Sequence, residues 1–307
     1  MSSNSRAHWQ LHFCVLLWGF TAILGKLITL TALQLVWWRM LIVALALLLV
    51  PKVWRELRAM SARTLAAYGG IGVLVALHWL TFYSAVKLAN ASVAATCIAL
   101  APVFLAFIEP MVVGRKFEPR ELALGIAVVP GVALVVGGVP ADMRIGVAVG
   151  VLSALFCAAF GACNKRMAER SGPLTITCVE LGAGTLFLTL VTTLWHAEGS
   201  FVLPDWHDAA LLLVLALACT LLPFALAMQV LRKLTAYTVQ LATNLEPVYA
   251  IVLAVLILGE QRQLDAWFYA GVAIILAAVF AHPLLSRRPL AKPPAEVLGT
   301  AESKAIE

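Results

Sequence analysis

The sequence predicts an all-α polytopic membrane protein with ten transmembrane helices, arranged as two inverted five-helix repeats around a central cavity. The first observation is composition: of 307 residues, 62% are hydrophobic and 12% are charged, and the mean hydropathy is +0.95. Such values are typical of chains that cross a lipid bilayer several times. The second observation is a set of ten apolar segments, and the third is a motif that recurs 145 residues later.

The ten apolar segments are each close to the ~20 residues that a helix needs to cross about 30 Å of hydrocarbon. We expect helices because lipid cannot satisfy the open backbone groups of other structures. The fifth segment is short and contains Pro130, which predicts a kink or a tilt. In order, the segments are 9–28, 32–51, 64–86, 90–112, 121–138, 145–164, 174–194, 208–230, 235–258 and 265–284.

The repeated motif relates the two halves of the chain. Residues 99–104 (ALAPVF) recur as residues 244–249 (NLEPVY), and a glycine follows at the same distance in each copy, Gly114 and Gly259. Each motif lies in the fourth apolar segment of its half. Five crossings are an odd number, so the second half enters the membrane from the opposite side. Inverted repeats of apolar helices are typical of secondary transporters, with the substrate site where the repeats meet.

Domain boundaries follow from this repeat. We expect an N-terminal five-helix repeat at 9–138 and a C-terminal one at 145–284. Residues 285–307 are rich in proline and polar residues, which predicts a disordered cytoplasmic tail.

Basic residues predict the orientation of the spans. With the N-terminus inside, 17 of the 22 Lys and Arg residues lie in inner loops or tails and only three in outer loops. This bias predicts ten spans in the inner (cytoplasmic) membrane with both termini in the cytoplasm. The net charge of +6 is therefore an orientation signal, and no nucleic-acid partner is expected. The stretch 52–63 mixes basic residues with Trp54 and Leu57, which predicts an amphipathic turn at the inner face.

Motifs for an enzyme or a metal centre are absent from the sequence. The six cysteines lie within apolar segments without a CxxC pair, which is typical of small buried hydrophobic residues. There is no G-x-S-x-G, no H-E-x-x-H and no pair of aspartates within the spans. No catalytic residue, metal or cofactor is therefore expected, and an intramembrane enzyme is a remote alternative.

Charged residues within the spans are the strongest local signal, because each costs about 2.5–3.5 kcal/mol at the bilayer centre on insertion scales. Arg39 would bind a substrate carboxylate or pair with a glutamate, and a structural ion pair is the alternative. Glu246 precedes Pro247, which bends helices and suggests a hinge or a polar notch. Lys26 lies near an outer end, where it can reach the surface. The in-span charges are Lys26, Arg39, Glu109, Glu180 and Glu246.

Aromatic and amide side chains complete the candidate site. Four of them lie on adjacent turns of the third span, where rings would stack on a ligand, and packing or an aromatic belt is the alternative. Gln240 and Asn244 share a face of the ninth span, roughly 200° around an ideal helix from Glu246. Proposed hinge residues are Pro102, Pro247, Gly114 and Gly259. Substrate-binding candidates are Trp18, Arg39, His78, Trp79, Phe82, Tyr83, Phe156, Phe160, Gln240, Asn244 and Glu246.

The segment from Asn244 through Leu258-Gly259-Glu260 resembles the EamA repeat of the drug/metabolite transporter superfamily, although the first copy has Gly114-Arg115 in place of Gly-Glu. Within that superfamily, the length and the aromatics of span three are similar to the YddG-type exporters of aromatic amino acids. The resemblance implies a ten-helix, basket-like fold and alternating access by bending helices, without ATP or a prosthetic group.

The expected function is export of small metabolites, including aromatic amino acids, by a secondary transporter in the lipid bilayer. A drug carrier or a nucleotide-sugar carrier of the same fold is the alternative. Nucleotide sugars require several cations for their phosphates, and the spans offer only Arg39 and Lys26. No driving ion is assigned, and Glu246, Glu180 and His78 are the candidate proton carriers.

Overall fold

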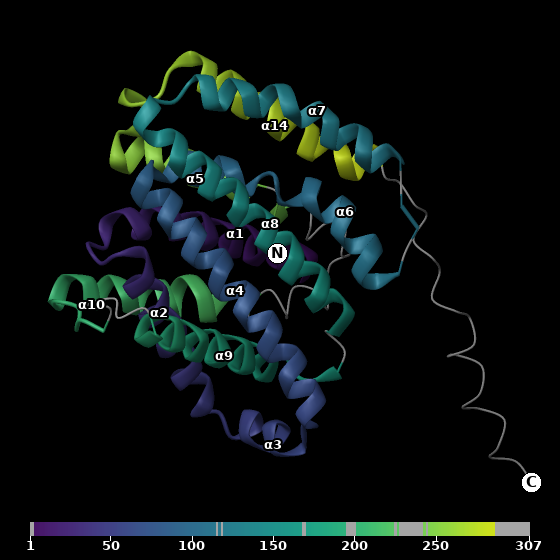
Figure 1. The fold of residues 1–307 in the computed structure, drawn as a ribbon, viewed down its shortest axis with the longest axis vertical. Coiled ribbons are helices and arrows are strands. Elements are labelled where there is room, and N and C mark those ends of the chain that lie inside the picture. The colour runs from purple at the N-terminus through teal and green to yellow at the C-terminus, as the bar shows by residue number, and fades with distance from the viewer. Residues whose placement is uncertain are drawn as a thin grey trace, which may run out of the picture.

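The fold described here comes from a computed structural model, which describes residues 3–114, 116–117, 119–167, 170–194, 201–223, 226, 242–243 and 245–285. Every element within these ranges is a helix (Figure 1). The first half contains α1 (Ser3–Leu27), α2 (Ala32–Leu48), α3 (Pro51–Ala59), α4 (Ala62–Leu88), α5 (Ala91–Ile98), α6 (Ala101–Val113) and α7 (Pro119–Gly137).

The second half repeats this pattern of long and interrupted helices. Its elements are η1 (Ala141–Met143), α8 (Arg144–Met167), α9 (Pro173–Leu194), α10 (Trp206–Leu213), η3 (Val214–Leu221), α13 (Glu246–Leu253), η4 (Ala254–Leu258), η5 (Glu260–Arg262) and α14 (Ala266–Leu285). The turns η1 and η5 are 3₁₀-helical, whereas η3 and η4 are π-helical continuations of α10 and α13.

Polar N-caps explain where several helices begin. Thr31, Ser61, Asn90 and Asp205 each accept a hydrogen bond from the backbone N–H three residues later, before α2, α4, α5 and α10. Such side chains satisfy amide groups that have no partner within the helix.

Five helical stretches are long and apolar enough to cross a membrane, and the structure therefore confirms a polytopic membrane protein. A sixth is obtained if α2 and α3, which meet at 91°, are one broken span. The other apolar helices are shorter, and each predicted segment overlaps a helix. The five long stretches are Arg6–Leu27, Ala62–Leu88, Ala91–Val113, Ala141–Met167 and Pro173–Leu194.

The fourth segment, Ala91–Val113, is one helical stretch of span length with a local break that the sequence did not predict. The break lies between α5, which ends at Ile98, and α6, which begins at Ala101. Pro102 lies in the first turn of α6, where its missing N–H costs nothing. The second copy of the motif has the same geometry, since Leu100 (φ −80°, ψ −12°) and Leu245 (φ −81°, ψ −10°) precede their helices with nearly identical dihedral angles.

The two glycines of the motif also have matching conformations. Gly114 ends α6 with φ 77°, and Gly259 ends η4 with φ 67°. These left-handed conformations favour glycine because it has no Cβ atom.

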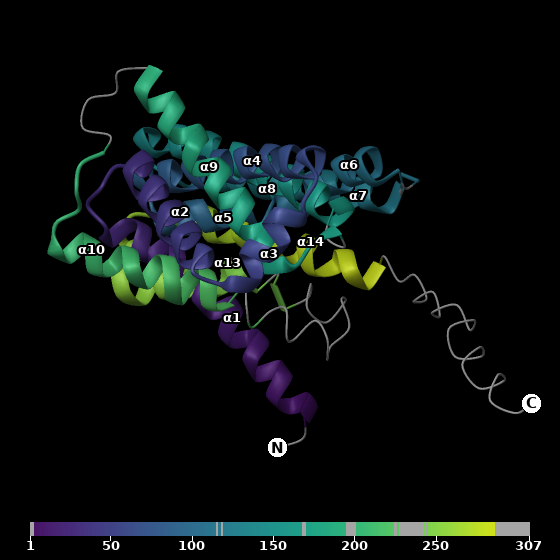
Figure 2. The ribbon, with the colours of Figure 1, turned by 90° about the horizontal axis from the view of Figure 1, so that it is seen from below.

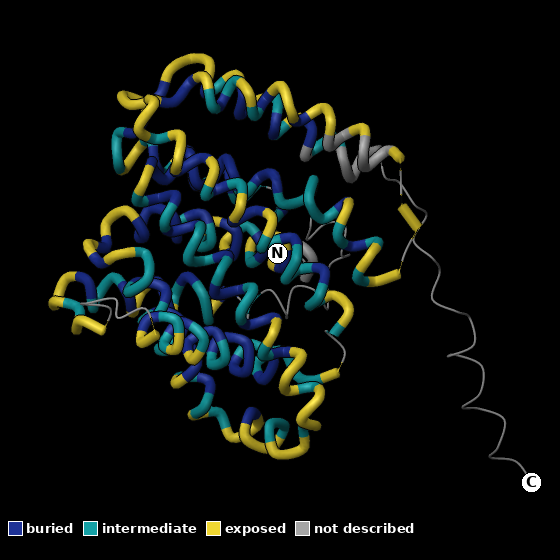
Figure 3. Tube along the Cα trace, in the orientation of Figure 1, coloured by how far each residue is buried: buried dark blue, intermediate teal, exposed yellow. Residues whose placement is uncertain are grey.

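Contacts between helices close a ring in the order α1, α13, α5, α8, α4, α9, α2, η3 and back to α1. The pair α7 and α14 lies side by side at one edge of the molecule, joined to the ring through α6 (Figures 1 and 2). Figure 3 shows buried residues along the ring helices and exposed residues along the outer side of α7 and α14. The ring brings helices from both halves around one interior.

Candidate functional site

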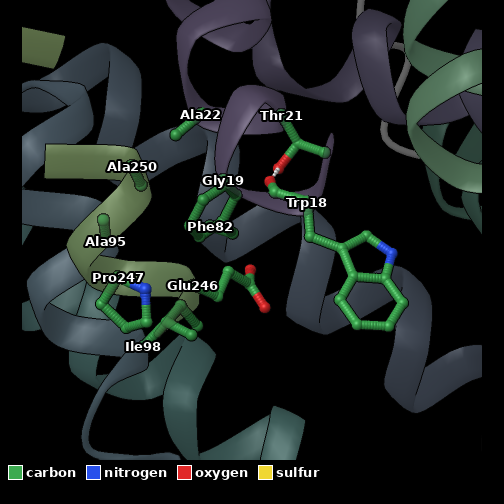
Figure 4. A pocket seen from close by; sticks show the side chains of 10 residues that line it. All are labelled: Trp18, Gly19, Thr21, Ala22, Phe82, Ala95, Ile98, Glu246, Pro247 and Ala250. Atoms are coloured by element: carbon green, nitrogen blue, oxygen red, sulfur yellow. Dashed lines mark hydrogen bonds between the residues drawn. The ribbon is translucent and has the colours of Figure 1, made fainter. Parts of the chain in front are cut away.

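A small cavity lies inside the ring, between α1, α4, α5 and α13 (Figure 4). Its walls are mainly small or aromatic residues, with one carboxylate. The lining residues are Trp18, Gly19, Thr21, Ala22, Phe82, Ala95, Ile98, Glu246, Pro247 and Ala250.

Glu246 is the first residue of α13, and its carboxylate points into this cavity beside the indole ring of Trp18 (Figure 4). No residue in the described part of the chain donates a hydrogen bond to it. The N-terminus of a helix favours negative charge, so the break before Pro247 provides a suitable electrostatic environment. Among the described residues, Glu246 is thus a carboxylate that faces the cavity without a hydrogen-bonding partner.

Arg39 on α2 is buried next to this region and contacts side chains of two other helices, α4 and η3. Its Nη1 donates to the hydroxyl of Tyr83 at 2.7 Å, and its Nε donates to Oγ1 of Thr220 at 3.0 Å. The Cζ atom lies 3.8 Å from the ring centroid of Trp79, which is a cation–π contact. Arg39 and Glu246 interact electrostatically, but they form no ion pair within 4.0 Å.

The aromatic residues of α4 face the interior of the ring. Phe82 lines the cavity and contacts Tyr83 edge-on, with ring centroids 5.2 Å apart. Tyr83 is fully buried, and Phe82 is nearly so. The side chains therefore contact protein groups, in contrast to an aromatic belt at the lipid surface.

His78 lies beside the cavity wall, because the centroid of its ring is 6.3 Å from that of Phe82. The Oγ atom of Ser153 lies 2.9 Å from Nδ1 of His78, and the centroid of Phe160 lies 5.4 Å from that of the imidazole ring. Phe156 is partly buried. Gln240 and Asn244 lie outside the described residues.

Several cavity-lining residues were not predicted from the sequence. Gly19, Thr21, Ala22, Ala95 and Ile98 have side chains that carry little chemistry. For Gly19, Thr21 and Ala22, their position next to Trp18 on α1 is a signal in the sequence, whereas Ala95 and Ile98 lie on another helix and have no such signal.

Two of the in-span charges have structural partners. Glu109 on α6 forms a salt bridge with Lys165 on α8. Nζ of Lys26 donates to the backbone oxygen of Ala89 at 3.2 Å and of Val86 at 3.4 Å. These contacts give both charged groups hydrogen-bonding partners and join neighbouring helices, which is a structural role.

Two carboxylates outside the cavity connect loops of opposite halves. Asp208 accepts hydrogen bonds from the amides of Thr29 and Leu30, at 2.9 and 3.0 Å. Glu56 accepts from the amide of Gly172 at 3.0 Å and from the hydroxyl of Thr175 at 2.6 Å.

The charge state of Glu56 follows from these contacts. The Thr175 hydroxyl is the main cause that holds the pKa of this carboxyl below its ordinary value of 4.5, with the Gly172 amide and nearby Lys52 acting in the same direction.

A cluster of metal-ligand types occurs at the start of α10. Asp205, His207 and Asp208 have ligand atoms within 4.8 Å of one another. Asp205 caps the helix, however, and the oxygens of Asp208 accept the hydrogen bonds from Thr29 and Leu30. The cluster therefore has a structural role in helix capping and loop attachment.

Comparisons with known proteins identify the family. The model of the EamA-like transporter family matches the chain twice, at residues 7–137 and 144–281. A solved structure, titled only as the crystal structure of a protein, is similar with 18% identity and a TM-score of 0.58; the alignment covers 93% of this chain and 99% of the other. No curated protein gives a significant sequence match. Because the two successive matches to the family model cover most of its length, the chain is a member of the EamA-like transporter family.

Proposed function

We propose that this protein is a secondary transporter that exports small metabolites, in particular amino acids including aromatic ones, by alternating access. The observation that carries the proposal is the carboxylate of Glu246, which faces an aromatic cavity without a hydrogen-bonding partner among the described residues. A carboxylate in that position attracts an ammonium group, because a charge-assisted hydrogen bond would offset its burial.

The other walls complement the rest of an amino acid. The rings of Trp18 and Phe82 offer an apolar surface for a side chain. Arg39 is not one of the residues that line the described cavity, but its buried guanidinium interacts electrostatically with Glu246 and would attract the substrate carboxylate. These features favour a small zwitterion.

The helix contacts support two inverted repeats. Each helix of the ring has an equivalent in the other half, and the equivalent pairs are α1 and α8, α2 and α9, α4 and η3, and α5 and α13. When the two members of every pair are exchanged, each contact of the ring becomes another contact of the ring. The α4–α8 pair, for example, becomes the η3–α1 pair. The two family matches and the matching breaks before Pro102 and Pro247 support the same arrangement. Repeats that rock about a shared site provide alternating access.

The location of the basic residues supports insertion in the inner membrane with both termini in the cytoplasm. A nucleotide-sugar carrier fits this cavity less well. Phosphate groups require several cations, whereas Arg39 is the one cation of the described residues that interacts electrostatically with Glu246.

Counterflow in proteoliposomes tests the proposal with a panel of labelled amino acids. Glu246→Gln is expected to reduce transport about ten- to hundredfold, because a hydrogen bond to a charged group is worth about 1.5–3 kcal/mol and each 1.4 kcal/mol is tenfold. Asp142→Asn, which removes an exposed carboxylate outside the cavity, is the matched control. The proposal is wrong if Glu246→Gln and Asp142→Asn transport equally well, or if the wild type transports no amino acid.

A further inference from the structure

Glu180 on α9 is a buried carboxyl group that the proposed substrate site does not use. Its exposed fraction is 6%. Oε2 accepts one long hydrogen bond, 3.4 Å from Nδ2 of Asn164 on α8. Oε1 is buried from solvent and has no hydrogen-bonding partner in the part of the chain that the structure describes. An ionised carboxylate in such surroundings is costly, and the group usually becomes neutral instead.

The charged and titratable groups on α2 and α4 do not compensate Glu180. Arg39 on α2 donates to Tyr83 and Thr220. On α4, the hydroxyl of Tyr68 donates to the backbone oxygen of Met167 at 2.9 Å, and His78 interacts with Ser153.

The charged groups on α8 and α3 also do not compensate Glu180. Lys165 forms its salt bridge with Glu109, and Nη1 of Arg166 donates to the backbone oxygen of Val112 at 3.0 Å. Glu56 on α3 is bonded at the start of α9. Among the described residues, Glu180 therefore has Asn164 as its polar partner and has no counter-charge.

Glu180 also lies where α4 and α9, which belong to different halves of the chain, approach each other closely. A Cβ atom at Gly72 on α4 would lie 2.1 Å from the backbone oxygen of Glu180, and one at Gly184 would lie 2.9 Å from the backbone oxygen of Gly72. There is no room for a larger residue or for water between these backbones. Any movement of α4 against α9 therefore changes the surroundings of the Glu180 side chain directly.

We propose that Glu180 is a proton-binding site that couples transport to a pH gradient. The carboxyl holds its proton while α4 and α9 are packed as in this structure, and it releases the proton to water when the two helices separate. One proton is bound from one side of the membrane and released to the other, and no further reactant is needed. The inference rests on the proposed transport function, but proton binding at Glu180 can be measured separately.

Proteoliposomes with an imposed pH gradient test the coupling. Glutamine resembles a protonated glutamate, so Glu180→Gln is expected to retain counterflow exchange within about twofold of wild type, while accumulation driven by the gradient falls at least about tenfold. Asp142→Asn is expected to behave as wild type in both assays. Accumulation by Glu180→Gln that matches wild type would overturn the proposal.

Infrared spectroscopy gives a readout that does not depend on transport. The wild type is expected to show a carbonyl-stretch band of a protonated carboxyl at neutral pH, and Glu180→Gln is expected to lack it. Absence of this band from the folded wild type overturns proton binding at Glu180. If the band is present but no amino acid is transported, the proposed function fails while the proton site stands.

Discussion

At the scale of single residues, Arg39 and Glu246 differ in how many of their polar atoms have hydrogen-bonding partners. Arg39 already has two hydrogen-bonding partners and one aromatic ring, whereas Glu246 has no hydrogen-bonding partner among the described residues. Arg39 is thus pre-positioned by its neighbours, which reduces the cost of ordering it when a substrate binds.

Arg39→Ala is expected to abolish transport of substrates with a carboxylate while folded protein remains in the membrane. Amines of similar shape that lack the carboxylate are expected to lose less transport, because they do not use the guanidinium. Counterflow of matched amino acids and amines, with expression followed by fluorescence-detected gel filtration, measures both effects. Equal losses for both substrate classes would indicate that Arg39 only stabilises the fold.

The carboxyl of Glu56 predicts a pH-dependent contribution to stability. Its pKa is lowered in the folded protein, chiefly by the Thr175 hydroxyl. The folded state therefore binds the proton less tightly than the unfolded state. The stabilisation is complete above the ordinary pKa of 4.5 and is lost as pH falls through the lower pKa of the folded state.

Thermal unfolding in detergent checks this prediction. The difference between the unfolding temperatures of wild type and Glu56→Gln is expected to be largest above pH 4.5 and to shrink at lower pH. Using the difference removes the contribution of other carboxyl groups. A difference that is constant across this range would contradict the role assigned to the Thr175 contact.

Residue chemistry could be predicted from the sequence only in part. A charge in an apolar run marks Arg39 and Glu246 as unusual, since burial of a charge must be compensated. The same signal marks Glu109, which the structure pairs with Lys165. Sequence separation does not reveal that pairing, because it depends on the packing of α6 against α8.

At the scale of elements, the local breaks before Pro102 and Pro247 are the main departure from the predicted helices. From the sequence, a proline within an apolar run predicts a helix that is bent at the proline but continues beyond it. In the structure, Pro102 and Pro247 each stand in the first turn of a new helix. The composition of the run could not distinguish these cases, because both place the same apolar residues in lipid.

Pro247→Ala is expected to slow exchange more than it weakens binding. The substitution restores a backbone N–H and removes the fixed φ angle, so α13 can extend across the break and become stiffer. Counterflow rates and equilibrium binding of one amino acid separate the two effects. Pro130→Ala in α7, outside the ring, is the control. A loss of affinity with an unchanged maximal rate would contradict a hinge at this position.

At the scale of the whole molecule, the sequence repeat predicts that equivalent loops face opposite sides of the membrane. The connection between α2 and α4 contains Arg58 on the short helix α3, and the corresponding connection after α9 contains Leu203; both residues are exposed. The ring itself could not be predicted from the sequence, because it depends on which helix faces meet. The sidedness of these loops, however, follows from the odd number of spans in each half.

Single cysteines at these two positions test the inversion directly. A membrane-impermeant maleimide applied to intact cells is expected to label Leu203→Cys but not Arg58→Cys, and permeabilised cells are expected to show labelling of both. The natural cysteines are buried or half-buried, and the unmodified protein measures their background. Labelling of both positions from the same side would place the two halves in parallel. In that case the symmetry of the ring contacts would not come from two inverted halves. Rocking of inverted halves about Glu246 would then be excluded.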